Sequence, residues 1–321
     1  MRPESYRLAS YAHRDGTPRA GIVVDDRILD VVEALGDTPI AARADEFTSV
    51  LAVLQHWSET RPALQQAAKQ LRERGAARGS PLSEVQLLAP VLYPGVILCA
   101  GANYRDHVAE MSKALNLPPE PDPHERGLKP WHFVKASAAC VRGTGSSIAL
   151  PAYSRKVDWE AEVALVMGRE CRNVGVDRAL EYAAGLTIAN DLSARDHLRR
   201  EGIAPESPFR YDWLSQKCFD GALPLGPWIA PLDDIDDVGR LGIKLWINDE
   251  LMQDSSTANM IFSMAEQVAH LSTRLTLRPG DVVVTGTPAG VGSARGRFLQ
   301  PGDRVRIWVE GVGELTNSFT D

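Results

Sequence analysis

Short apolar runs separated by turn signals dominate the first part of the chain. Residues 1–80 contain YRLASYAHRDGTPRAGIVVDDRILDVVEAL, in which runs typical of β-strands are separated by Asp15-Gly16 and Asp25-Asp26. Two segments with apolar residues at helical spacing follow, near Asp45–Trp57 and Pro62–Arg74. The pattern therefore predicts a small α+β module, in which a strand meander is followed by two helices.

A change in composition marks the end of this module. The segment Gly75 to Val85, GAARGSPLSEV, is small, polar and proline-containing, so we expect two domains, at residues 1–80 and 81–321. Strand-like runs dominate the second domain: GVILCAG, AEVALVMG, LGIKLWIND, GDVVVTGTP and DRVRIWVEGVGEL. Helices are expected near Val176–Ala184 and Met260–Leu271. Because strands and helices do not alternate strictly, the pattern favours a mixed, β-rich α+β fold over a doubly wound α/β fold.

Composition narrows the class of protein. The 321 residues are 44% hydrophobic and 24% charged, as in ordinary globular proteins. A net charge of -7 gives no basic footprint for nucleic acid, and no apolar run approaches the roughly 20 residues that cross a bilayer. The N-terminal MRPESYRLAS lacks the apolar segment of a secretory signal. Four separated cysteines without a CxxC pair fit a reducing compartment, so we expect a cytoplasmic protein.

Three carboxylates stand at alternate positions in KVDWEAEVALVMG, Lys156 to Gly168: Asp158, Glu160 and Glu162. In an extended chain these side chains share one face, and a bound cation would remove their repulsion. Carboxylate oxygens are the ligands that Mg²⁺, Mn²⁺ and Ca²⁺ prefer. Asp191 in TIANDLSARD closes an apolar run and is the candidate third ligand. The residues alone leave a second interpretation open, a strand with a solvated acidic face.

A histidine and a glutamate form a second group of candidates. The stretch CAGANYRDHVAEM begins as a strand, turns at Gly101 and enters a helix for which Asn103 is the expected N-cap. His107 and Glu110 lie three residues apart, so they share a helix face and can form a hydrogen bond. A carboxylate that orients an imidazole makes it a competent general base. The alternative is a capped surface helix with an incidental pair.

A series of longer strings runs from about Val96 to the C-terminus: GANYRDHVAE, FVKASAA, VDWEAEVALVMG, NDLSARD, QKCFDGALPLGPW, WINDELMQ, GDVVVTGTPAGVG and VEGVGEL. Together these strings resemble the fumarylacetoacetate hydrolase family. The resemblance implies a mixed β-roll catalytic domain, a homodimer, and cleavage or rearrangement of small β-dicarbonyl acids. It also implies a divalent metal, Mg²⁺ or Mn²⁺ with Ca²⁺ as an alternative, held by Glu160, Glu162 and Asp191.

The resemblance assigns roles to further residues. His107 with Glu110 resembles the family's water-activating pair, and Lys217 of QKCFD resembles the lysine that stabilises negative charge on the substrate. Asp158 looks like a supporting position rather than a ligand. Other matched positions line the substrate site or contact the substrate: Lys135 of FVK, Arg195 of SARD and Thr287 of GTP.

The chain departs from the family pattern at one place in the pocket wall. Where the family's SARDxQ has a glutamine, this chain has Leu198, preceded by His197. We therefore expect Leu198 to face the substrate and to favour acyl groups that are less polar, with Arg199–Gln216 reshaping the same wall. The segment Ala114–Lys129 is rich in proline and charge, which predicts a mobile surface loop or lid.

These residues predict a metal-dependent hydrolase that cleaves a C–C bond of a 2,4-dioxo acid. In that mechanism His107, held by Glu110, deprotonates the attacking water, and Lys217 stabilises the enolate that leaves. Two alternatives remain open from the sequence. The first is an isomerase or decarboxylase of an unsaturated oxo-diacid on the same fold. The second is a non-catalytic metal-binding scaffold.

Overall fold

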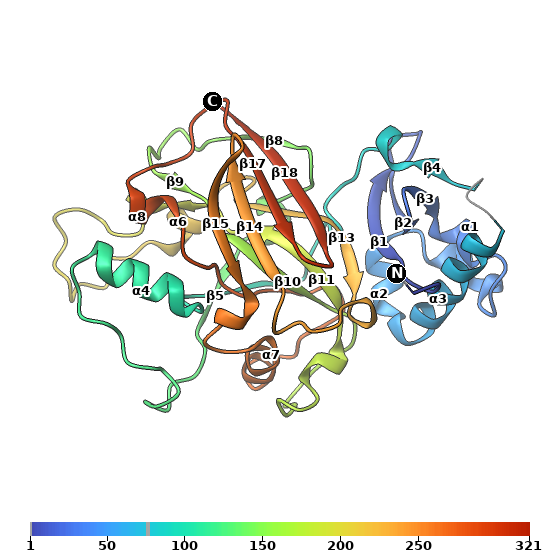
Figure 1. Cartoon of the computed structure of the whole chain (residues 1–321), viewed down its shortest axis with the longest axis horizontal. Helices are drawn as coiled ribbons and strands as arrows, with labels where there is room; N and C mark the ends of the chain where they lie inside the picture. Colours follow the sequence, from blue (N-terminus) through green and yellow to red (C-terminus); the bar gives the residue numbers. More distant parts are fainter. Residues whose placement is uncertain (1, 75–77) are drawn as a thin grey trace.

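A long mixed sheet connects the two parts of the chain. The computed structural model describes residues 2–74 and 78–321, so the boundary segment Gly75–Val85 lies partly outside the described residues. The strand order is β4-β3-β2-β1-β13-β11-β10-β16-β5-β6, and β7 pairs with β13. Figure 1 places the N-terminal module at the right and the remaining chain at the left. The β-rich mixed fold predicted from the sequence is confirmed.

The strands, with their bounds, are β1 (Arg7–Ala12), β2 (Pro18–Val24), β3 (Arg27–Asp30), β4 (Ser80–Pro81), β5 (Ile97–Ala100), β6 (His132–Lys135), β7 (Val141–Arg142), β8 (Ser147–Ala149), β9 (Val157–Asp158), β10 (Ala161–Met167), β11 (Ala183–Asn190), β12 (Ser193–Ala194), β13 (Leu223–Pro231), β14 (Gly242–Ile247), β15 (Glu250–Ser256), β16 (Val282–Val284), β17 (Arg304–Val309) and β18 (Gly313–Thr320). The α-helices are α1 (Val31–Leu35), α2 (Val50–Gln55), α3 (Trp57–Glu73), α4 (Arg105–Ala114), α5 (Ser137–Cys140), α6 (Trp213–Lys217), α7 (Met264–Ser272) and α8 (Gly292–Arg295). Short 3₁₀ helices are η1 (Ala41–Glu46), η2 (Leu82–Glu84), η3 (Ala179–Tyr182), η4 (Arg195–His197), η5 (Leu232–Asp234) and η6 (Thr257–Asn259).

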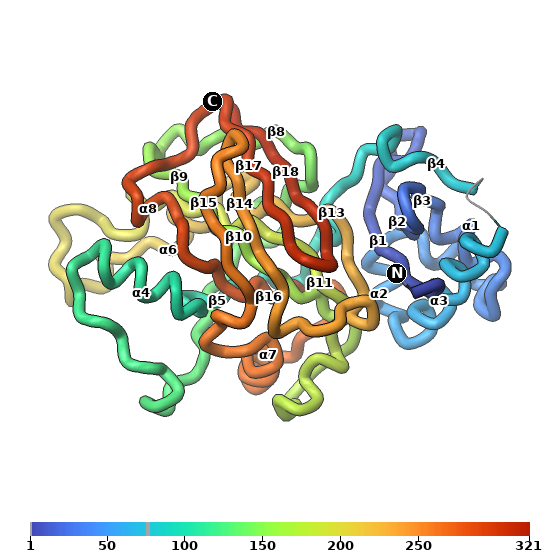
Figure 2. Tube along the Cα trace, viewed as in Figure 1, coloured from blue at the N-terminus to red at the C-terminus, as the bar shows by residue number. Residues whose placement is uncertain are grey.

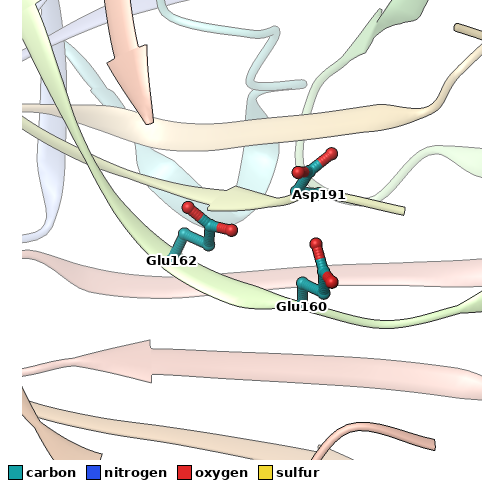
Figure 3. A group of neighbouring side chains, drawn as sticks. All are labelled: Glu160, Glu162 and Asp191. Atoms are coloured by element: carbon teal, nitrogen blue, oxygen red, sulfur yellow. The ribbon is translucent and has the colours of Figure 1, made fainter. Parts of the chain in front are cut away.

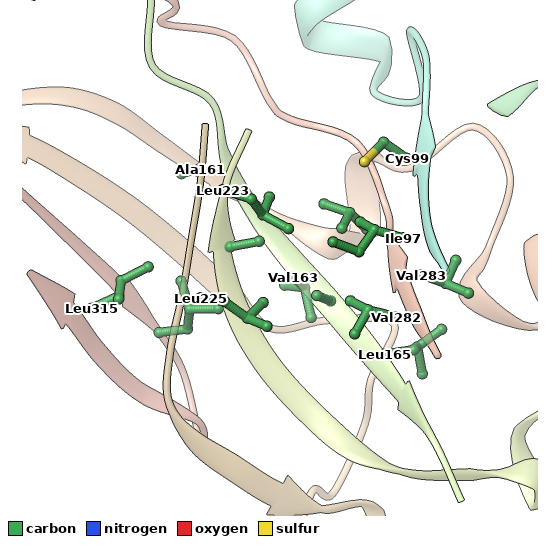
Figure 4. Packing of buried hydrophobic residues seen from close by; sticks show 14 of the residues in the cluster. Ile97, Cys99, Ala161, Val163, Leu165, Leu223, Leu225, Val282, Val283 and Leu315 are labelled. Carbon is green, nitrogen blue, oxygen red and sulfur yellow. The ribbon is translucent and has the colours of Figure 1, made fainter. Parts of the chain in front are cut away.

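The main core lies between the long sheet and a second sheet of order β15-β14-β17-β18-β8. In β14 and β17 buried residues alternate with more exposed ones, as expected for strands with one face on the core. Every residue of β10 and β11 is buried, because both faces of these central strands are covered. Figure 4 shows apolar residues of the two sheets packed against each other, among them Val163, Leu225 and Leu315.

The N-terminal module has a hydrophobic cluster of its own. Helix α3 buries Trp57, Leu64 and Ala68 at helical spacing and packs against β2. The module is not separate from the rest, because β1 pairs with β13 in an antiparallel register, with Leu8 opposite Ile229. The division at residues 1–80 and 81–321 stays a prediction.

The predicted helices differ from the observed ones in their limits. The segment Asp45–Trp57 contains α2, and the helix predicted over Pro62–Arg74 begins already at Trp57, which enters the core. Helix α7 overlaps the predicted Met260–Leu271, but it starts at Met264, after the N-cap Ser263 that forms a capping box with Glu266, and ends at Ser272. The helix predicted near Val176–Ala184 is wrong, since only the 3₁₀ turn η3 forms there and Ala183 already begins β11.

The predicted strand runs and the predicted loop are found where expected. Four of the strand runs named from the sequence for the second domain contain β5, β10, β14 and β16, and the run DRVRIWVEGVGEL contains β17 and the first residues of β18 (Figure 2). After α4 the chain up to Lys129 is irregular, and the side chain of His124 joins it to α7 by a 3.0 Å contact with Glu266. The mobility of this loop stays a prediction. Within the described residues, no helix combines the length and apolar character that a membrane crossing needs.

Candidate metal centre

Three buried carboxylates converge where β10 and β11 meet. Glu162 lies on β10, Glu160 directly precedes this strand, and Asp191 directly follows β11. The backbone N–H of Asp191 donates to the Glu160 carbonyl at 2.9 Å, so the antiparallel pairing extends to these two residues. Cross-strand neighbours share a sheet face, as do residues two apart on one strand. Carboxylate oxygens of the three residues therefore lie within 4.8 Å of one another (Figure 3).

Three cationic side chains surround this triad of Glu160, Glu162 and Asp191. Lys217 Nζ donates to Glu160 Oε2 and to Asp191 Oδ2, both at 2.7 Å. Lys135 Nζ donates to Asp191 Oδ1 and, at 3.0 Å, to the carbonyl of Leu192. Arg195 donates to Glu160 Oε1. Glu160 and Asp191 are thus paired with positive charge on several sides.

The charge balance differs between the two glutamates. Burial opposes ionisation of Glu160, but Arg195 and Lys217 outweigh it and hold the pKa of Glu160 below its usual value. Burial raises the pKa of Glu162 well above its usual value, and the charges of Asp191 and Glu160 raise it further. Glu162 accepts a hydrogen bond from the backbone N–H of Gly286, but no cationic side chain is paired with it among the described ion pairs.

These residues fit a divalent cation. Carboxylate oxygens are hard ligands that suit Mg²⁺, Mn²⁺ and Ca²⁺. A cation at the triad would supply the positive charge that Glu162 lacks, and it would allow all three carboxylates to be ionised together. The triad predicted from the alternation of carboxylates is brought together in the structure, whereas the assignment of an ion to it stays a prediction.

Asp158 is connected to the triad through Arg195, which contacts both Asp158 and Glu160. Its carboxylate accepts hydrogen bonds from the backbone N–H groups of Trp159 at 2.9 Å, Gly292 at 2.6 Å and Ser293 at 3.0 Å. It also accepts from Arg195 Nε at 2.9 Å. Because these bonds satisfy its oxygens, Asp158 positions Arg195 beside Glu160, consistent with the supporting role expected of it.

The histidine and glutamate of α4 do not form the expected hydrogen bond. Glu110 Oε2 instead accepts from the backbone N–H of Gly290 at 2.8 Å. The Nδ1 atom of His107 is buried and has no hydrogen-bond partner in the described part of the chain. Burial lowers the pKa of His107, while the charge of Glu160 counteracts part of this effect. A neutral imidazole beside the triad remains suited to accept a proton.

Asn103 is not the N-cap of α4, as the sequence had suggested. The cap position is Tyr104, which makes no side-chain cap hydrogen bond. The amide of Asn103 is buried and donates to the carbonyls of Phe262 at 3.0 Å and Thr285 at 2.8 Å. Asn103 therefore connects the start of α4 to the loop that carries Gly286, a contact between segments far apart in sequence.

Two of the other residues considered for substrate contacts, Thr287 and His197, form hydrogen bonds within the protein. Thr287 Oγ1 donates to the Ala161 carbonyl at 3.0 Å and accepts from Gln253 Nε2 at 3.0 Å, so its hydroxyl proton is already used. Leu198 follows η4 and is half-buried. His197 Nε2 lies 2.7 Å from the carbonyl of Tyr153, so this ring nitrogen is engaged within the protein.

Several residues near the triad were missed by the sequence reasoning. Gln253 accepts from the backbone N–H of Ala161 at 3.0 Å and is buried, which anchors the start of β10 to β15. The aromatic residues Trp131, Phe133 and Trp213 gather beside Lys217. The alternation of Trp131, Phe133 and Lys135 in PWHFVK is a signal that could have placed the first two on the same side as the lysine.

We predict that Lys217→Met destabilises the metal-free protein. Removing the ammonium leaves Glu160 and Asp191 without one of their buried cationic partners, and breaking a buried ion pair from one side costs about 3–5 kcal/mol. Urea unfolding in the presence of chelator measures the change in the free energy of unfolding. Lys69→Met is the control, because Lys69 forms an exposed pair with Glu73 and its loss should have little effect. Equal stabilities of the two variants would contradict the role of Lys217.

We further predict that Glu110 acts through the position of α4 rather than through His107. The amide oxygen of Glu110→Gln can still accept from the N–H of Gly290, so this variant should retain most of its kcat. Glu110→Ala cannot accept that bond, and its kcat should fall further. Steady-state kinetics of both variants test this; a Gln variant as impaired as the Ala variant would mean that the negative charge itself is required.

The comparisons with known proteins identify the family of the chain. The profile of the family described as "Fumarylacetoacetate (FAA) hydrolase C-terminal" matches residues 96–320, and the chain belongs to this family. "Oxaloacetate tautomerase Fahd2a, mitochondrial" of Rattus norvegicus is 36% identical over 271 residues, 80% of each chain. Maleylpyruvate hydrolase from Sphingobium sp. SYK-6, solved with manganese(II) and pyruvate, is 27% identical with a TM-score of 0.71 over 98% of each chain.

A third relative carries another activity in its name. The structure of 5-carboxymethyl-2-hydroxymuconate delta-isomerase from Mycobacterium smegmatis is 30% identical, with a TM-score of 0.69, and covers 98% of this chain and 99% of that chain. Relatives of this chain thus include a hydrolase, an isomerase and a tautomerase. All three relatives are named as enzymes, but their names differ in the reaction.

Proposed function

We propose that the chain is a divalent-metal-dependent hydrolase that cleaves a C–C bond of a 2,4-dioxo acid, an acylpyruvate or fumarylpyruvate-like compound. The observation that carries this proposal is the buried triad of Glu160, Glu162 and Asp191. Lys217 donates to two of its carboxylates, and the charge of Glu160 acts on His107. Maleylpyruvate hydrolase, a relative solved with manganese(II) and pyruvate, supports the same choice.

The proposed ion is Mg²⁺ or Mn²⁺, held by the three carboxylates; Ca²⁺ is an alternative that takes the same oxygen ligands in larger number. When bound, the cation supplies Lewis-acid polarisation of the substrate oxygens. Lys135 and Arg195 keep Asp191 and Glu160 in place through their ion pairs. We assign these two cations to the lining of the substrate site, together with Thr287 and Leu198.

The proton transfers fall to His107. In its neutral form the imidazole accepts a proton from a water molecule, whose oxygen adds to the C4 carbonyl of the dioxo acid. The C3–C4 bond then breaks, its electron pair stays on C3, and the acyl part leaves as a carboxylic acid. The ammonium of Lys217 stabilises the enolate of pyruvate. Proton return to C3 gives pyruvate, so one water is consumed for each acid and pyruvate formed.

A second candidate is a tautomerase or isomerase that uses the same enolate. Two observations favour it: His107 is not hydrogen-bonded to Glu110, and relatives named as an oxaloacetate tautomerase and a delta-isomerase share most of this chain's length. In that case His107 would move a proton between carbon and oxygen and no water would be consumed.

The proposal is tested with acetylpyruvate as the substrate. Chelator-treated protein should be inactive, and added Mn²⁺ or Mg²⁺ should restore its activity. The activity is measured as a decrease in the ultraviolet absorbance of the enol form of the substrate. The products should be acetate and pyruvate, identified by NMR. Metal-dependent interconversion of oxaloacetate tautomers without any cleavage of acetylpyruvate would favour the second candidate instead.

We predict that Leu198→Gln changes the choice of acyl group. An apolar wall leaves a buried polar substrate group unpaired, which costs about 1–3 kcal/mol. The variant should therefore gain kcat/KM for fumarylpyruvate relative to an alkyl acylpyruvate, while Leu251→Gln, at an exposed position of β15, should not. An unchanged ratio in Leu198→Gln would mean that Leu198 does not face the substrate.

Two further expectations belong to the proposal. A homodimer is expected by resemblance to the family, and analytical ultracentrifugation tests it. The cytoplasmic location stays a prediction, and the rat relative is described as mitochondrial.

A further inference from the structure

Two elements run outward from the triad, and each carries a lysine at its inner end and a tryptophan at its outer end. On the edge strand β6, Lys135 contacts Asp191 and Phe133 lies two positions earlier; Trp131, directly before the strand, continues the alternation. On α6, Lys217 is the last residue and Trp213 the first, four positions earlier, so the two share one helix face.

The aromatic rings of these two elements form one cluster. The rings of Phe133 and Trp213 are stacked, with centroids 5.5 Å apart and an interplanar angle of 21°. Trp131 meets Trp213 edge-on at 5.7 Å and lies 6.3 Å from Phe133. These are the separations at which aromatic pairs attract one another. Trp131, Phe133 and Trp213, the aromatic cluster, therefore form a single preorganised surface.

The cluster is continuous with the metal centre. Lys217 Nζ lies 4.8 Å from the ring centroid of Phe133, within the range of a cation–π contact. The same ammonium donates to Glu160 and Asp191. Alternate residues of a strand are roughly 7 Å apart, so Trp131 lies about two such steps outward from Lys135. The cluster thus extends from the carboxylate-binding lysines toward the surface.

The outer rings remain uncovered by the chain. Trp131 is 48% exposed and Trp213 41% exposed. The ring of Trp131 also packs over Gly101, where a β-carbon would lie 1.9 Å from the indole. Gly101 therefore allows the indole to lie flat at the end of β5. Exposed rings held in fixed orientation next to a catalytic site offer a planar ligand a stacking surface.

We infer that the aromatic cluster is a subsite for a planar, apolar group at the distal end of the substrate, such as an aryl or conjugated alkenyl group. This inference rests on the proposed function and narrows its substrate class. A four-carbon acid such as oxaloacetate would be held entirely at the triad and would not reach Trp131. A longer acylpyruvate would place its oxo-acid end at the triad and its tail on the rings.

Binding to the Mn²⁺-loaded protein tests the inference without turnover. The two probes are 2-oxobutanoate and 2-oxo-4-phenylbutanoate, which share the oxo-acid end and differ by a phenyl group, and neither has the second carbonyl needed for cleavage. Isothermal titration should show that the phenyl group tightens binding to wild type by roughly tenfold. In Trp213→Leu this ratio should fall toward one, while the affinity for 2-oxobutanoate stays unchanged. Tyr93→Leu, at an exposed aromatic residue elsewhere, is the control.

The outcomes separate this inference from the proposed function. If neither acid binds in the presence of Mn²⁺, the proposed function itself fails. If both bind equally well to wild type, or if the ratio is unchanged in both Trp213→Leu and Trp131→Leu, the inference is wrong and the proposed function stands. Sedimentation of the same variants tests whether a second copy of the chain covers this surface instead. If Trp213→Leu dissociates a dimer while the ratio of the two affinities persists, the rings belong to an interface between two copies and the inference is wrong.

Discussion

The double variant Glu160→Ala, Glu162→Ala is expected to bind Mn²⁺ at least about 100-fold more weakly than wild type. Changes to residues that merely orient a metal ligand already lower affinity by roughly 10–100-fold, and this variant removes two of the three carboxylates in the triad. Isothermal titration of chelator-treated protein with Mn²⁺ measures the effect. Glu314→Ala is the control, because Glu314 lies at the surface and pairs only with Arg306 among the described residues.

In the same variant, the melting temperature should no longer depend on Mn²⁺. A ligand that binds only the folded protein raises its melting temperature by mass action. Mn²⁺ should therefore raise the melting temperature of wild type and of Glu314→Ala, and chelator should reverse the effect. The double variant should melt at one temperature in both conditions. Mn²⁺ affinity equal to that of wild type in the double variant would place the ion elsewhere.

His107→Ala is expected to lower kcat for acetylpyruvate by roughly 10²–10⁴-fold, the usual contribution of a positioned base. The affinity for Mn²⁺ should remain close to that of wild type, because His107 is not one of the converging carboxylates. His13→Ala, on the N-terminal module, serves as the control for loss of an imidazole. Loss of Mn²⁺ binding in His107→Ala would make His107 a ligand, and an unchanged kcat would assign the proton transfer to another group.

The triad could be predicted because its geometry is local. Alternation along one extended segment is enough to place Glu160 and Glu162 on one face, and the end of the next strand places Asp191 beside them. The β-rich fold was predictable for the same reason, since apolar runs such as AEVALVMG read as strands without knowledge of their partners. The pairing of β10 with β11 then brought the two segments together.

The helix limits were harder to predict because tertiary contacts override local signals. The apolar residues at helical spacing suggested a helix that starts at Pro62. Burial of Trp57 extends α3 toward the N-terminus instead. Near Val176 the apolar spacing looked helical, but the residues from Ala183 onward pair with two neighbouring strands, and these hydrogen bonds decide the conformation.

The partners of polar side chains on α4 could not be read from spacing. The prediction that Glu110 bonds His107 used only their separation of three residues. In the folded chain Gly290, which is distant in sequence, presents a free N–H to Glu110. Asn103 likewise bonds Phe262 and Thr285 rather than the first turn of the helix. Both residues serve long-range contacts whose donors and acceptors only the fold brings near.

Product analysis of one reaction tests the central claim most directly. Chelator-treated protein is incubated with acetylpyruvate, with and without Mn²⁺, and the products are followed by NMR. Our proposal predicts acetate and pyruvate in equal amounts, formed with Mn²⁺ and absent both without it and in the Glu160→Ala, Glu162→Ala variant. Intact acetylpyruvate in the presence of a protein that binds Mn²⁺ and interconverts the tautomers of oxaloacetate would contradict it.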